Sequence, residues 1–304
     1  MNHRILVTGI GGPAGRAVAT ALHARGIHVM GTDIIDVPAP DGVRVVQVPP
    51  ATDPDAVDAL RRLIAEEGIT VLIPTVSDEL PRISAARAWF GDNVHVAISA
   101  PGPVSLANDK LLTAWVLDAA GVPVPRFGVP GDFADAGVAM AALGAPVVVK
   151  PRISRGGRGV LVIDSPDAVD WDALPAGMIV QEFIPGTEYG PMVHGTEQGS
   201  PDTPFAVVFE KTELAQGIIG NAVAGHRVGA EDAADVGTAA LAAVRALGLA
   251  GPADVDVRRR ADGTPAVLEV NARFGANSAF APELLDAVLA SAATRLGASA
   301  HVLV

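Results

Sequence analysis

The sequence contains no cysteine, a single tyrosine and fewer basic than acidic residues. Without cysteine the chain can form no disulfide, no thiolate nucleophile and no sulfur-ligated zinc site, and a chain of this size without disulfides is typical of the cytosol. The 22 basic residues against 34 acidic ones give a net charge of -12, which argues against binding nucleic acid through its phosphate backbone. Any anionic ligand must therefore be held by a local cluster of basic side chains.

Long hydrophobic runs are missing as well. Residues 1–7 lead directly into a strand-like segment without a signal-peptide core, and charged residues, glycine or proline interrupt each apolar stretch before it reaches membrane-spanning length. We therefore expect a cytoplasmic protein with no targeting or membrane segment. Its 304 residues, 49% of them hydrophobic, are enough for about two globular domains.

The first hundred residues alternate between strand and helix patterns. This alternation predicts a parallel sheet covered by helices, with strands at residues 4–8, 28–33, 69–74 and 94–98. A segment rich in proline and glycine, residues 99–103, is the predicted linker to the rest of the chain. Beyond it we expect a small α+β unit and then a strand pair, 253–258 and 266–271, joined at a turn containing Asp262 and Gly263.

A basic, glycine-rich loop follows the apolar strand-like stretch that ends in Lys150. The loop carries two arginines, Arg155 and Arg158, among three glycines: Gly156, Gly157 and Gly159. Glycines let backbone N–H groups approach phosphate oxygens closely, and the basic side chains supply positive charge. No Gly-Lys-Ser or Gly-Lys-Thr follows, so this is not a Walker loop. The stretch predicts a nucleotide-phosphate site of another kind, with a solvated loop at a sheet edge as the alternative.

Residues 8–15 offer a second nucleotide site. Their glycine spacing fits a dinucleotide-binding loop, and Asp33 ends the next strand where such proteins bind a ribose hydroxyl. The alternative is that the glycines only let the helix pack closely on the strand. Oxidoreductases and epimerases with this spacing also use a tyrosine with a lysine four residues later, but Tyr189 is followed at that distance by Val193. An NAD(P)-binding oxidoreductase or epimerase is therefore the alternative function, and a non-catalytic nucleotide-binding regulator is the third.

Three oxygen-bearing side chains lie on the predicted strand pair. Asp256 is on one strand, and Glu269 and Asn271 are two residues apart on the other, so they share a face. Valine and leucine flank Glu269, so its carboxylate is expected to be buried and to need a partner. Magnesium takes carboxylate and amide oxygens together with substrate phosphates. The set predicts a magnesium site, with a polar, solvent-facing hairpin as the alternative.

Taken in order, these motifs resemble the ATP-grasp superfamily, most closely its carboxylate-amine ligases and carbamoyl-phosphate-synthetase-like members. The resemblance covers nearly the whole chain and rests on an ordered set of fragments: Asn108-Asp109-Lys110, Val149-Lys150-Pro151, Gly156 to Val160, Gln181 to Tyr189, Asp256, and Leu268 to Arg273. It implies an α/β and α+β protein with a Rossmann-like, pre-ATP-grasp domain over residues 1–102 that normally binds no NAD. A small ATP-grasp lobe would follow over residues 103–184, and a large lobe with the metal site over residues 185–304.

The resemblance also implies an ATP site. The residues expected to bind the nucleotide are Lys110, Lys150, Arg155, Gly156, Gly157, Gly159, Gln181, Glu182, Phe183, Ile184 and Glu188. Among them the two lysines would contact phosphates, with Lys150 also near adenine. The backbone around Glu182 and Ile184 and the side chain of Gln181 would bind adenine, and Glu188 would bind ribose. Gln181, Gly157 and Ala272 depart from the residues that are common at these positions.

Asp256, Glu269 and Asn271 would bind two magnesium ions, for which manganese is an alternative. Arg273 and Lys211 are the expected catalytic residues: Arg273 would meet the transferred phosphoryl group or the substrate carboxylate, and Lys211 would lie over the phosphates. The expected activity is an ADP-forming ligase that activates a carboxylate as an acyl phosphate and passes it to an amine.

The expected partners are these two small molecules, without nucleic acid or membrane. The oligomeric state stays open, although relatives often form homodimers. The sequence does not identify the acid or the amine, or the exact roles of Lys211, Arg227, His194 and His226.

Overall fold

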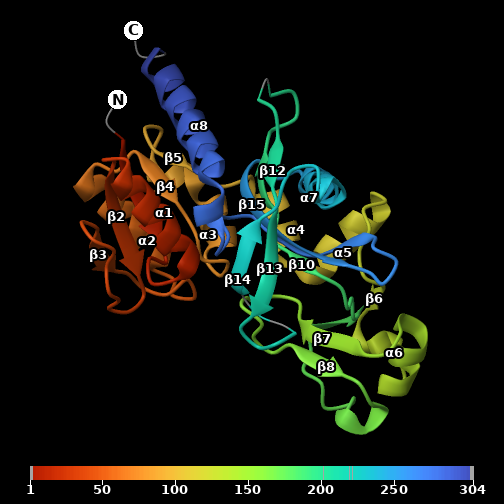
Figure 1. The fold of residues 1–304 in the computed structure, drawn as a ribbon. Coiled ribbons are helices and arrows are strands. Elements are labelled where there is room, and N and C mark those ends of the chain that lie inside the picture. Colours follow the sequence, from red (N-terminus) through yellow and green to blue (C-terminus); the bar gives the residue numbers. More distant parts are fainter. Residues whose placement is uncertain (1–2, 201, 219, 221, 302–304) are drawn as a thin grey trace.

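The computed structural model describes residues 3–200, 202–218, 220 and 222–301, and it opens with a five-stranded parallel sheet (Figure 1). The order of its strands is β3-β2-β1-β4-β5. The strands are β1 (Arg4–Thr8), β2 (His28–Asp33), β3 (Arg44–Gln47), β4 (Val71–Ile73) and β5 (His95–Val96), and the connecting helices are α1 (Pro13–Ala24), α2 (Ala56–Glu67) and α3 (Leu80–Ala85). The predicted parallel, helix-covered sheet is confirmed.

The burial of β1 explains its apolar sequence. Ile5, Leu6 and Val7 have no exposed surface, because helices cover both faces of the sheet. At the carboxyl end of the sheet Thr8 pairs with Thr32 of β2, and the glycine stretch leads from this point into α1, which begins at Pro13. Proline suits the first helical position, since its missing N–H would have no partner there.

The segment predicted to be a linker is partly helical. Residues 99–103 run into α4 (Pro101–Asn108), because Pro101 again occupies a first helical position. Helix α5 (Lys110–Ala119) follows directly, and the Asp109 carboxylate caps it by accepting from the N–H of Leu111 at 3.0 Å. This cap fixes Lys110 as the first residue of α5.

A four-stranded antiparallel sheet forms the lower part of the molecule in Figure 1, with strand order β6-β9-β7-β8. Its strands are β6 (Phe127–Gly128), β7 (Val147–Pro151), β8 (Leu161–Ile163) and β9 (Met178–Glu182), and α6 (Ala136–Leu143) packs against it. This sheet has a hydrophobic cluster of its own, which includes Met140, Val149 and Val180. Lys150 belongs to β7 and lies at one end of this sheet.

A seven-stranded sheet fills the centre of the molecule, and β15 lies at its middle, paired with β10, β11 and β16. Its strands are β10 (Glu188–Tyr189), β11 (Met192–Gly195), β12 (Phe205–Val207), β13 (Phe209–Leu214), β14 (Ala222–Arg227), β15 (Gly251–Arg259) and β16 (Pro265–Asn271). Helices α7 (Ala234–Ala246) and α8 (Pro282–His301) complete this part. The predicted hairpin turn is confirmed by Gly263, whose φ of 87° suits glycine.

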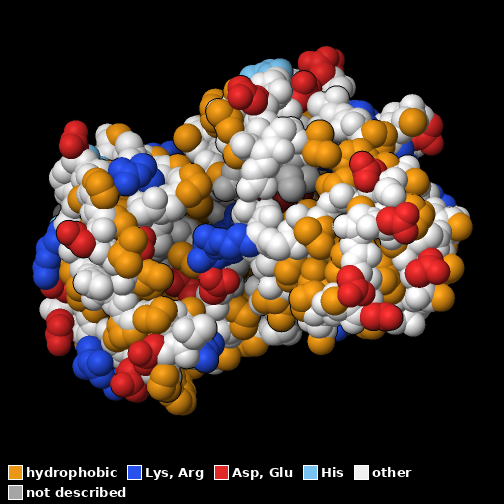
Figure 2. All heavy atoms as spheres, turned by 90° about the horizontal axis from the view of Figure 1, so that it is seen from below, with side chains coloured by type: hydrophobic (Ala, Val, Ile, Leu, Met, Phe, Trp, Pro, Cys, Tyr) orange, Lys and Arg blue, Asp and Glu red, His pale blue; other side chains and the backbone are white. Residues whose placement is uncertain are grey.

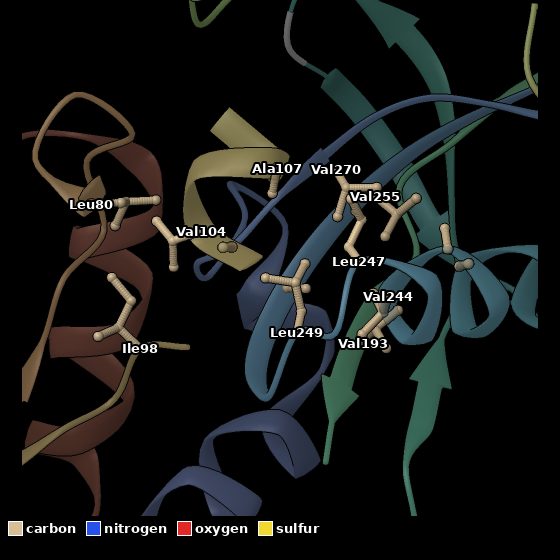
Figure 3. Packing of buried hydrophobic residues seen from close by; sticks show 14 of the residues in the cluster. Leu80, Ile98, Val104, Ala107, Val193, Val244, Leu247, Leu249, Val255 and Val270 are labelled. Atoms are coloured by element: carbon tan, nitrogen blue, oxygen red, sulfur yellow. The ribbon is translucent and has the colours of Figure 1, made fainter. Parts of the chain in front are cut away.

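One hydrophobic cluster joins the parallel sheet to the central sheet. It runs from Leu80 and Ile98 through Val104 of α4 to Val255 of β15 and Val244 of α7 (Figure 3). Short 3₁₀ helices, η1 (Arg87–Phe90), η2 (Pro130–Asp132), η3 (Pro166–Ala168) and η4 (Ser278–Phe280), occupy the connections. Within the described residues, none of the helices is both long and apolar enough to cross a membrane.

Candidate active site

A cavity of about 160 Å³ lies between the four-stranded sheet and the central sheet. It brings together nearly all the residues expected at the ATP and metal sites: Lys110, Lys150, Arg155, Gly156, Gly157, Gln181, Glu182, Phe183, Ile184, Glu188, Lys211, Asp256, Glu269, Asn271 and Arg273. Gly159 belongs to the same loop but does not line the cavity; a Cβ atom there would lie 2.9 Å from Pro151. We refer to this space as the first cavity.

Burial of Lys150 distinguishes it from an ordinary surface lysine. It follows the buried Val149 at the end of β7, and 8% of its surface is exposed. This burial disfavours the charged ammonium and lowers the pKa of Lys150 to about 8, although Glu269 opposes the shift. The side chain is thus held in the cavity by a rigid strand, and it can change protonation near neutral pH.

Lys110 and Lys211 are paired with the carboxylates of the predicted metal site. Lys110 Nζ lies 3.2 Å from Glu269 Oε2 and donates to the carbonyl of Ser154 at 2.9 Å. Lys211 Nζ lies 2.5 Å from Asp256 Oδ1 and 2.7 Å from Glu188 Oε1. The charges of Lys110 and Lys211 are therefore neutralised by their carboxylate partners.

The strand register places the predicted metal ligands side by side. Asp256 of β15 is directly opposite Glu269 of β16, and Asp254 is opposite Asn271. Burial raises the pKa of Asp256 to about 7 despite Lys211, whereas Lys110 and Lys150 overcome burial and hold the pKa of Glu269 at about 2. Asn271 Nδ2 also donates to Glu269 Oε1 at 3.3 Å.

This donor set suits a hard cation. Two carboxylates and an amide oxygen are the ligands that magnesium takes when substrate phosphates complete its coordination. Among the residues that the structure describes, no group of three histidine, cysteine, aspartate or glutamate side chains could hold a metal by itself. A cation here would have to draw the two carboxylates away from Lys110 and Lys211.

The end of β9 and the residues that follow it form the wall predicted to hold adenine. Gln181 is buried, and the Glu182 carboxylate binds Arg260 at 2.7 Å and the N–H of Arg126 at 3.1 Å. Burial opposes ionisation of Glu182, but these donors hold its pKa below the usual range. The Glu182 N–H also donates to the carbonyl of Arg126 at 2.8 Å. Side chain and N–H of Glu182 are therefore both engaged within the protein.

Glu188, the predicted ribose ligand, is held by two cations. Its Oε1 accepts from Lys211, and its Oε2 lies 2.6 Å from both Nε and Nη2 of Arg258. Arg258 also stacks its guanidinium 5.7 Å from the centre of the Phe183 ring and donates to the carbonyl of Ile184 at 3.2 Å. Arg258 was missed at the sequence level, although it lies two residues beyond Asp256 and therefore shares its face.

Arg273 reaches the edge of the first cavity. Its Nη1 donates to Asp254 Oδ2 at 2.9 Å, and its Nε lies 3.5 Å from the hydroxyl of Ser77. Arg155 of the glycine-rich loop makes a similar contact, with Nε 2.7 Å from Asp78 Oδ2. Both arginines thus connect the central and four-stranded sheets to the connection that follows β4.

A second cavity of about 130 Å³ begins where these arginines lie. Four residues line both cavities: Arg155, Gly156, Arg273 and Ala276. The remaining wall of the second cavity comes from Gly9, Gly12, Pro13, Ala14, Gly15, Thr75, Val76 and Ser77. Viewed from below the orientation of Figure 1, basic and acidic side chains lie together at the crease between the parallel sheet and the rest of the molecule (Figure 2).

The N-terminal glycine stretch is closed by internal hydrogen bonds. Gly11 N–H donates to Asp33 Oδ2 at 2.9 Å, Gly12 N–H to the carbonyl of Gly9 at 2.9 Å, and Ile10 N–H to the carbonyl of Thr32 at 3.0 Å. A Cβ atom on Gly15 would lie 2.3 Å from the carbonyl oxygen of Gly9. Asp33 thus braces the loop, and the glycines allow close packing of α1 on β1.

Three polar residues whose roles the sequence leaves open, Arg227, His194 and His226, do not line the first cavity. Arg227 pairs with Glu283 at 2.7 Å, and both side chains are about half exposed. His194 of β11 is buried and stacks on Phe205 with 5.7 Å between ring centres. His226 lies in β14 opposite Glu210.

The small number of lysines is a feature of the sequence that also indicates the candidate site. The chain has only three lysines, Lys110, Lys150 and Lys211, and all of them line the first cavity. Arginine supplies every other basic side chain among the 22 basic residues. A lysine ammonium is a compact point charge that suits phosphate oxygens, whereas arginine is favoured for planar, bidentate pairing. The scarcity of lysine in this chain therefore already indicated its three phosphate-contact candidates.

Known proteins match the part of the chain that forms the first cavity. Residues 107–277 match the family of ATP-grasp domains. Over 183 residues the chain is 31% identical to a formate-dependent phosphoribosylglycinamide formyltransferase of Parasynechococcus marenigrum (strain WH8102), covering 57% of this chain and 46% of that protein. It is 27% identical over 260 residues to a D-alanine–D-alanine ligase of Desulforudis audaxviator (strain MP104C), covering 80% and 77%. The chain spans about half the length of the first of these curated relatives.

Solved structures share the fold. The L-amino acid ligase from Bacillus licheniformis superimposes with a TM-score of 0.68 at 21% identity, covering 91% of this chain and 69% of that one. Biotin carboxylase from Campylobacter jejuni gives 0.69 at 14% identity, covering 97% and 71%. None of these proteins is an oxidoreductase by name, and Asp33 is occupied by the loop that it braces, so the NAD(P) alternative has no support. With its family match extending from the end of α4 past the last residue of β16, the chain belongs to the ATP-grasp family.

Proposed function

We propose that this protein is an ATP-dependent ligase that joins a carboxylate to an amine through an acyl phosphate and releases ADP and phosphate. One observation carries the proposal: the first cavity collects three lysines, a glycine-rich loop and two paired carboxylates, and it shares Arg155 and Arg273 with a second cavity. A nucleotide in the first cavity would thus have a neighbouring space for an acceptor. The relatives include ligases that are named for small molecules, which supports the same class of reaction.

In the proposed reaction, an oxygen of the acid attacks the γ-phosphorus of ATP and ADP leaves. The amine nitrogen then attacks the acyl carbon, phosphate leaves, and the nitrogen loses a proton. Lys110 and Lys150 would hold the phosphates, and Arg273 would face the group in transfer. Asp254 fixes one nitrogen of Arg273, so that its guanidinium is positioned before the substrates bind.

Asp256, Glu269 and Asn271 would hold magnesium, and we propose two ions. When bound, magnesium neutralises the phosphate charge and aligns the γ-phosphoryl group. Lys110 and Lys211 are then freed from their carboxylate partners and can turn toward phosphate oxygens. The glycine-rich loop would close over the nucleotide, excluding water that would otherwise hydrolyse the acyl phosphate.

For adenine we propose the backbone between Glu182 and Ile184 together with the Gln181 side chain. The Glu182 N–H and the Ile184 carbonyl already have partners in Arg126 and Arg258, so the Ile184 N–H and the Glu182 carbonyl are the groups proposed to face the base. Glu188 would bind ribose only after one of its two cations moves, and Lys211 is the one that phosphates would attract.

The finer organisation is part of the proposal. We divide the chain into a Rossmann-like domain (residues 1–102), a small ATP-grasp lobe (residues 103–184) and a large lobe (residues 185–304). The parallel strand order of the first sheet supports the first division, and the separate hydrophobic cluster of the four-stranded sheet supports the second. A cytoplasmic location and a homodimer stay predictions.

Calorimetric titration with ATP and magnesium, and in parallel with NAD, tests the nucleotide. We expect binding of ATP and none of NAD. With hydroxylamine in place of the amine, the correct acid should give a hydroxamate that depends on ATP, and Lys150→Ala should abolish it. Isotope-labelled carboxylate oxygen should appear in the released phosphate. AMP as the stoichiometric product would overturn the acyl phosphate mechanism.

A further inference from the structure

Arg258 is an arginine that is buried in the wall of the first cavity. Only 7% of its surface is exposed, and it lies near the end of β15 among the residues that line the cavity. Arginine is rarely buried to this extent without partners, because an unpaired buried charge costs much free energy. The partners of Arg258 therefore show what it does in the cavity.

Three segments of the chain hold the guanidinium group of Arg258. Nε and Nη2 each lie 2.6 Å from Glu188 Oε2, Nη1 donates to the carbonyl of Ile184 at 3.2 Å, and Nη2 donates to the carbonyl of Ile218. The group also lies 5.7 Å from the centre of the Phe183 ring. These partners engage all three nitrogens of a planar fork, so the position of Arg258 is fixed before a nucleotide binds.

The register of the central sheet places Glu188 between two cations. Glu188 of β10 lies directly opposite Arg258 of β15 on one side and opposite Lys211 of β13 on the other. The three side chains therefore form a row across neighbouring strands, as cross-strand partners do. Arg258 binds Oε2 of the carboxylate and Lys211 binds Oε1. Each oxygen of Glu188 thus has a cation of its own.

The two cations differ in how firmly they are held. Lys211 divides its single ammonium group between Glu188 and Asp256. Arg258 is held by two backbone carbonyls in addition to Glu188. Phosphates and a metal ion at Asp256 would draw Lys211 away, but they would leave those carbonyls in place. Departure of Lys211 frees Oε1 of Glu188, which can then accept from a hydroxyl group while Oε2 stays bound.

We propose that Arg258 is a positioning residue that makes the first cavity prefer a nucleotide with ribose hydroxyls. It acts through Glu188: it holds Oε2, so that Oε1 faces a ribose hydroxyl once Lys211 has turned to the phosphates. This inference rests on the proposed function, because it takes ATP to occupy the first cavity with its ribose at Glu188. The alternative is a purely structural role, in which Arg258 only ties β15 to the segments that contain Ile184 and Ile218.

Two nucleotides separate these roles. ATP and 2′,3′-dideoxy-ATP carry the same base and phosphates, but only ATP has ribose hydroxyls. In calorimetric titrations with magnesium, we expect the wild-type protein to bind ATP about tenfold more tightly, the scale of one hydrogen bond to a charged group. Arg258→Met should lower the affinity for ATP to that for dideoxy-ATP and leave the affinity for dideoxy-ATP close to the wild-type value. A structural role would weaken both alike and keep their ratio, which would overturn the inference.

Arg259 supplies the matched control. It is the next residue of β15, on the opposite face, and its Nη1 and Nη2 lie 2.6 Å and 2.9 Å from the carboxylate oxygens of Asp235. Its guanidinium lies 5.3 Å from the centre of the Tyr189 ring, and it does not line the first cavity. Arg259→Met thus removes an arginine with the same kinds of partner and should keep the preference for ATP. Equal loss of the preference in both variants would contradict a specific role of Arg258.

A paired substitution keeps the test decisive if Arg258→Met does not fold. Arg258→Met combined with Glu188→Met removes both charges, so neither is left buried without the other. Because the preference is proposed to pass through Glu188, Glu188→Met alone and the double variant should both bind the two nucleotides equally. A wild-type preference in the double variant would overturn the inference.

The titrations also distinguish failure of the inference from failure of the proposed function. If the wild-type protein binds ATP and dideoxy-ATP equally tightly, the inference is wrong and the ligase function is unaffected. If it binds neither nucleotide, the proposed function itself is wrong.

Discussion

Two glycine-rich segments of this chain look alike in sequence and differ in structure. In the N-terminal stretch, a Cβ atom on Gly9, Gly11 or Gly15 would lie 2.3 to 2.8 Å from another atom of the protein. In the loop after Lys150, a Cβ atom on Gly157 would meet nothing closer than 3.3 Å, and its φ is 72°. Glycine therefore serves close packing at Gly11 and Gly15 and backbone conformation at Gly157. Gly9, with a φ of 61°, and Gly159, where a Cβ atom would lie 2.9 Å from Pro151, combine both uses. The local glycine pattern alone cannot distinguish these uses.

The largest expected effect concerns the proposed metal ligands, which line the first cavity together with the second segment. Glu269→Gln keeps the shape of the side chain and removes its charge, so turnover should fall by about 10²- to 10³-fold or more while the fold survives. Steady-state kinetics at saturating magnesium provides the measurement. Glu213→Gln, on an exposed part of β13, is the control. Near-normal turnover in Glu269→Gln would contradict the proposal that Glu269 binds magnesium.

The second prediction separates the two uses of glycine. Gly15→Ala forces a methyl group against the Gly9 carbonyl, so the free energy of unfolding should fall by about 1–3 kcal/mol, visible as a lower Tm. Gly157→Ala strains only a left-handed loop conformation, which costs about 1–2 kcal/mol. Its effect should appear as weaker ATP binding. If Gly15→Ala weakened ATP binding as much as Gly157→Ala did, the comparison would be wrong.

Magnesium removal is the third test. Without magnesium, the phosphates would meet the carboxylates of Asp256 and Glu269, whose lysine partners are already in use. ATP should therefore bind at least about tenfold more weakly in a chelator, which corresponds to ~1.4 kcal/mol. Calorimetry with and without magnesium measures the difference. In the double variant Asp256→Asn, Glu269→Gln the dependence on magnesium should largely disappear, and an unchanged dependence would contradict this account.

The smallest effect is the pH dependence of ATP binding. The pKa of Lys150 is lowered to about 8 by burial, so the free protein loses this proton as the pH rises through 8. Phosphates favour the ammonium form, so binding should take up a proton at higher pH, and affinity should fall by at most tenfold per pH unit above 8. Calorimetry in buffers of different ionisation enthalpy measures the uptake. Lys150→Arg should bind without this pH dependence; if it kept the same profile, another group would be responsible.

The order of the motifs made the fold and the first cavity predictable, because each motif marks one strand or loop of a known arrangement. Contacts between distant segments were not predictable from spacing. The pair of Arg155 with Asp78 joins residues 77 positions apart, and the pairing of Lys211 with Asp256 depends on how β13 and β15 are placed in the sheet. Residues 101–103 begin a helix although their prolines and glycine indicate a break, since proline also suits the start of a helix. That residues 99–103 separate two domains stays a prediction.

Strand β15 also sets the spacing between three contacts of the candidate site. Three alternate residues on one of its faces make three separate contacts in the candidate site: Asp254 binds Arg273, Asp256 binds Lys211, and Arg258 binds Glu188. Alternate residues of a strand are spaced by roughly 6.5 Å, so these three contacts follow one another at similar intervals along one backbone. A slip of one residue would turn all three side chains to the opposite face. Any redesign of the first cavity must therefore keep the register of this strand.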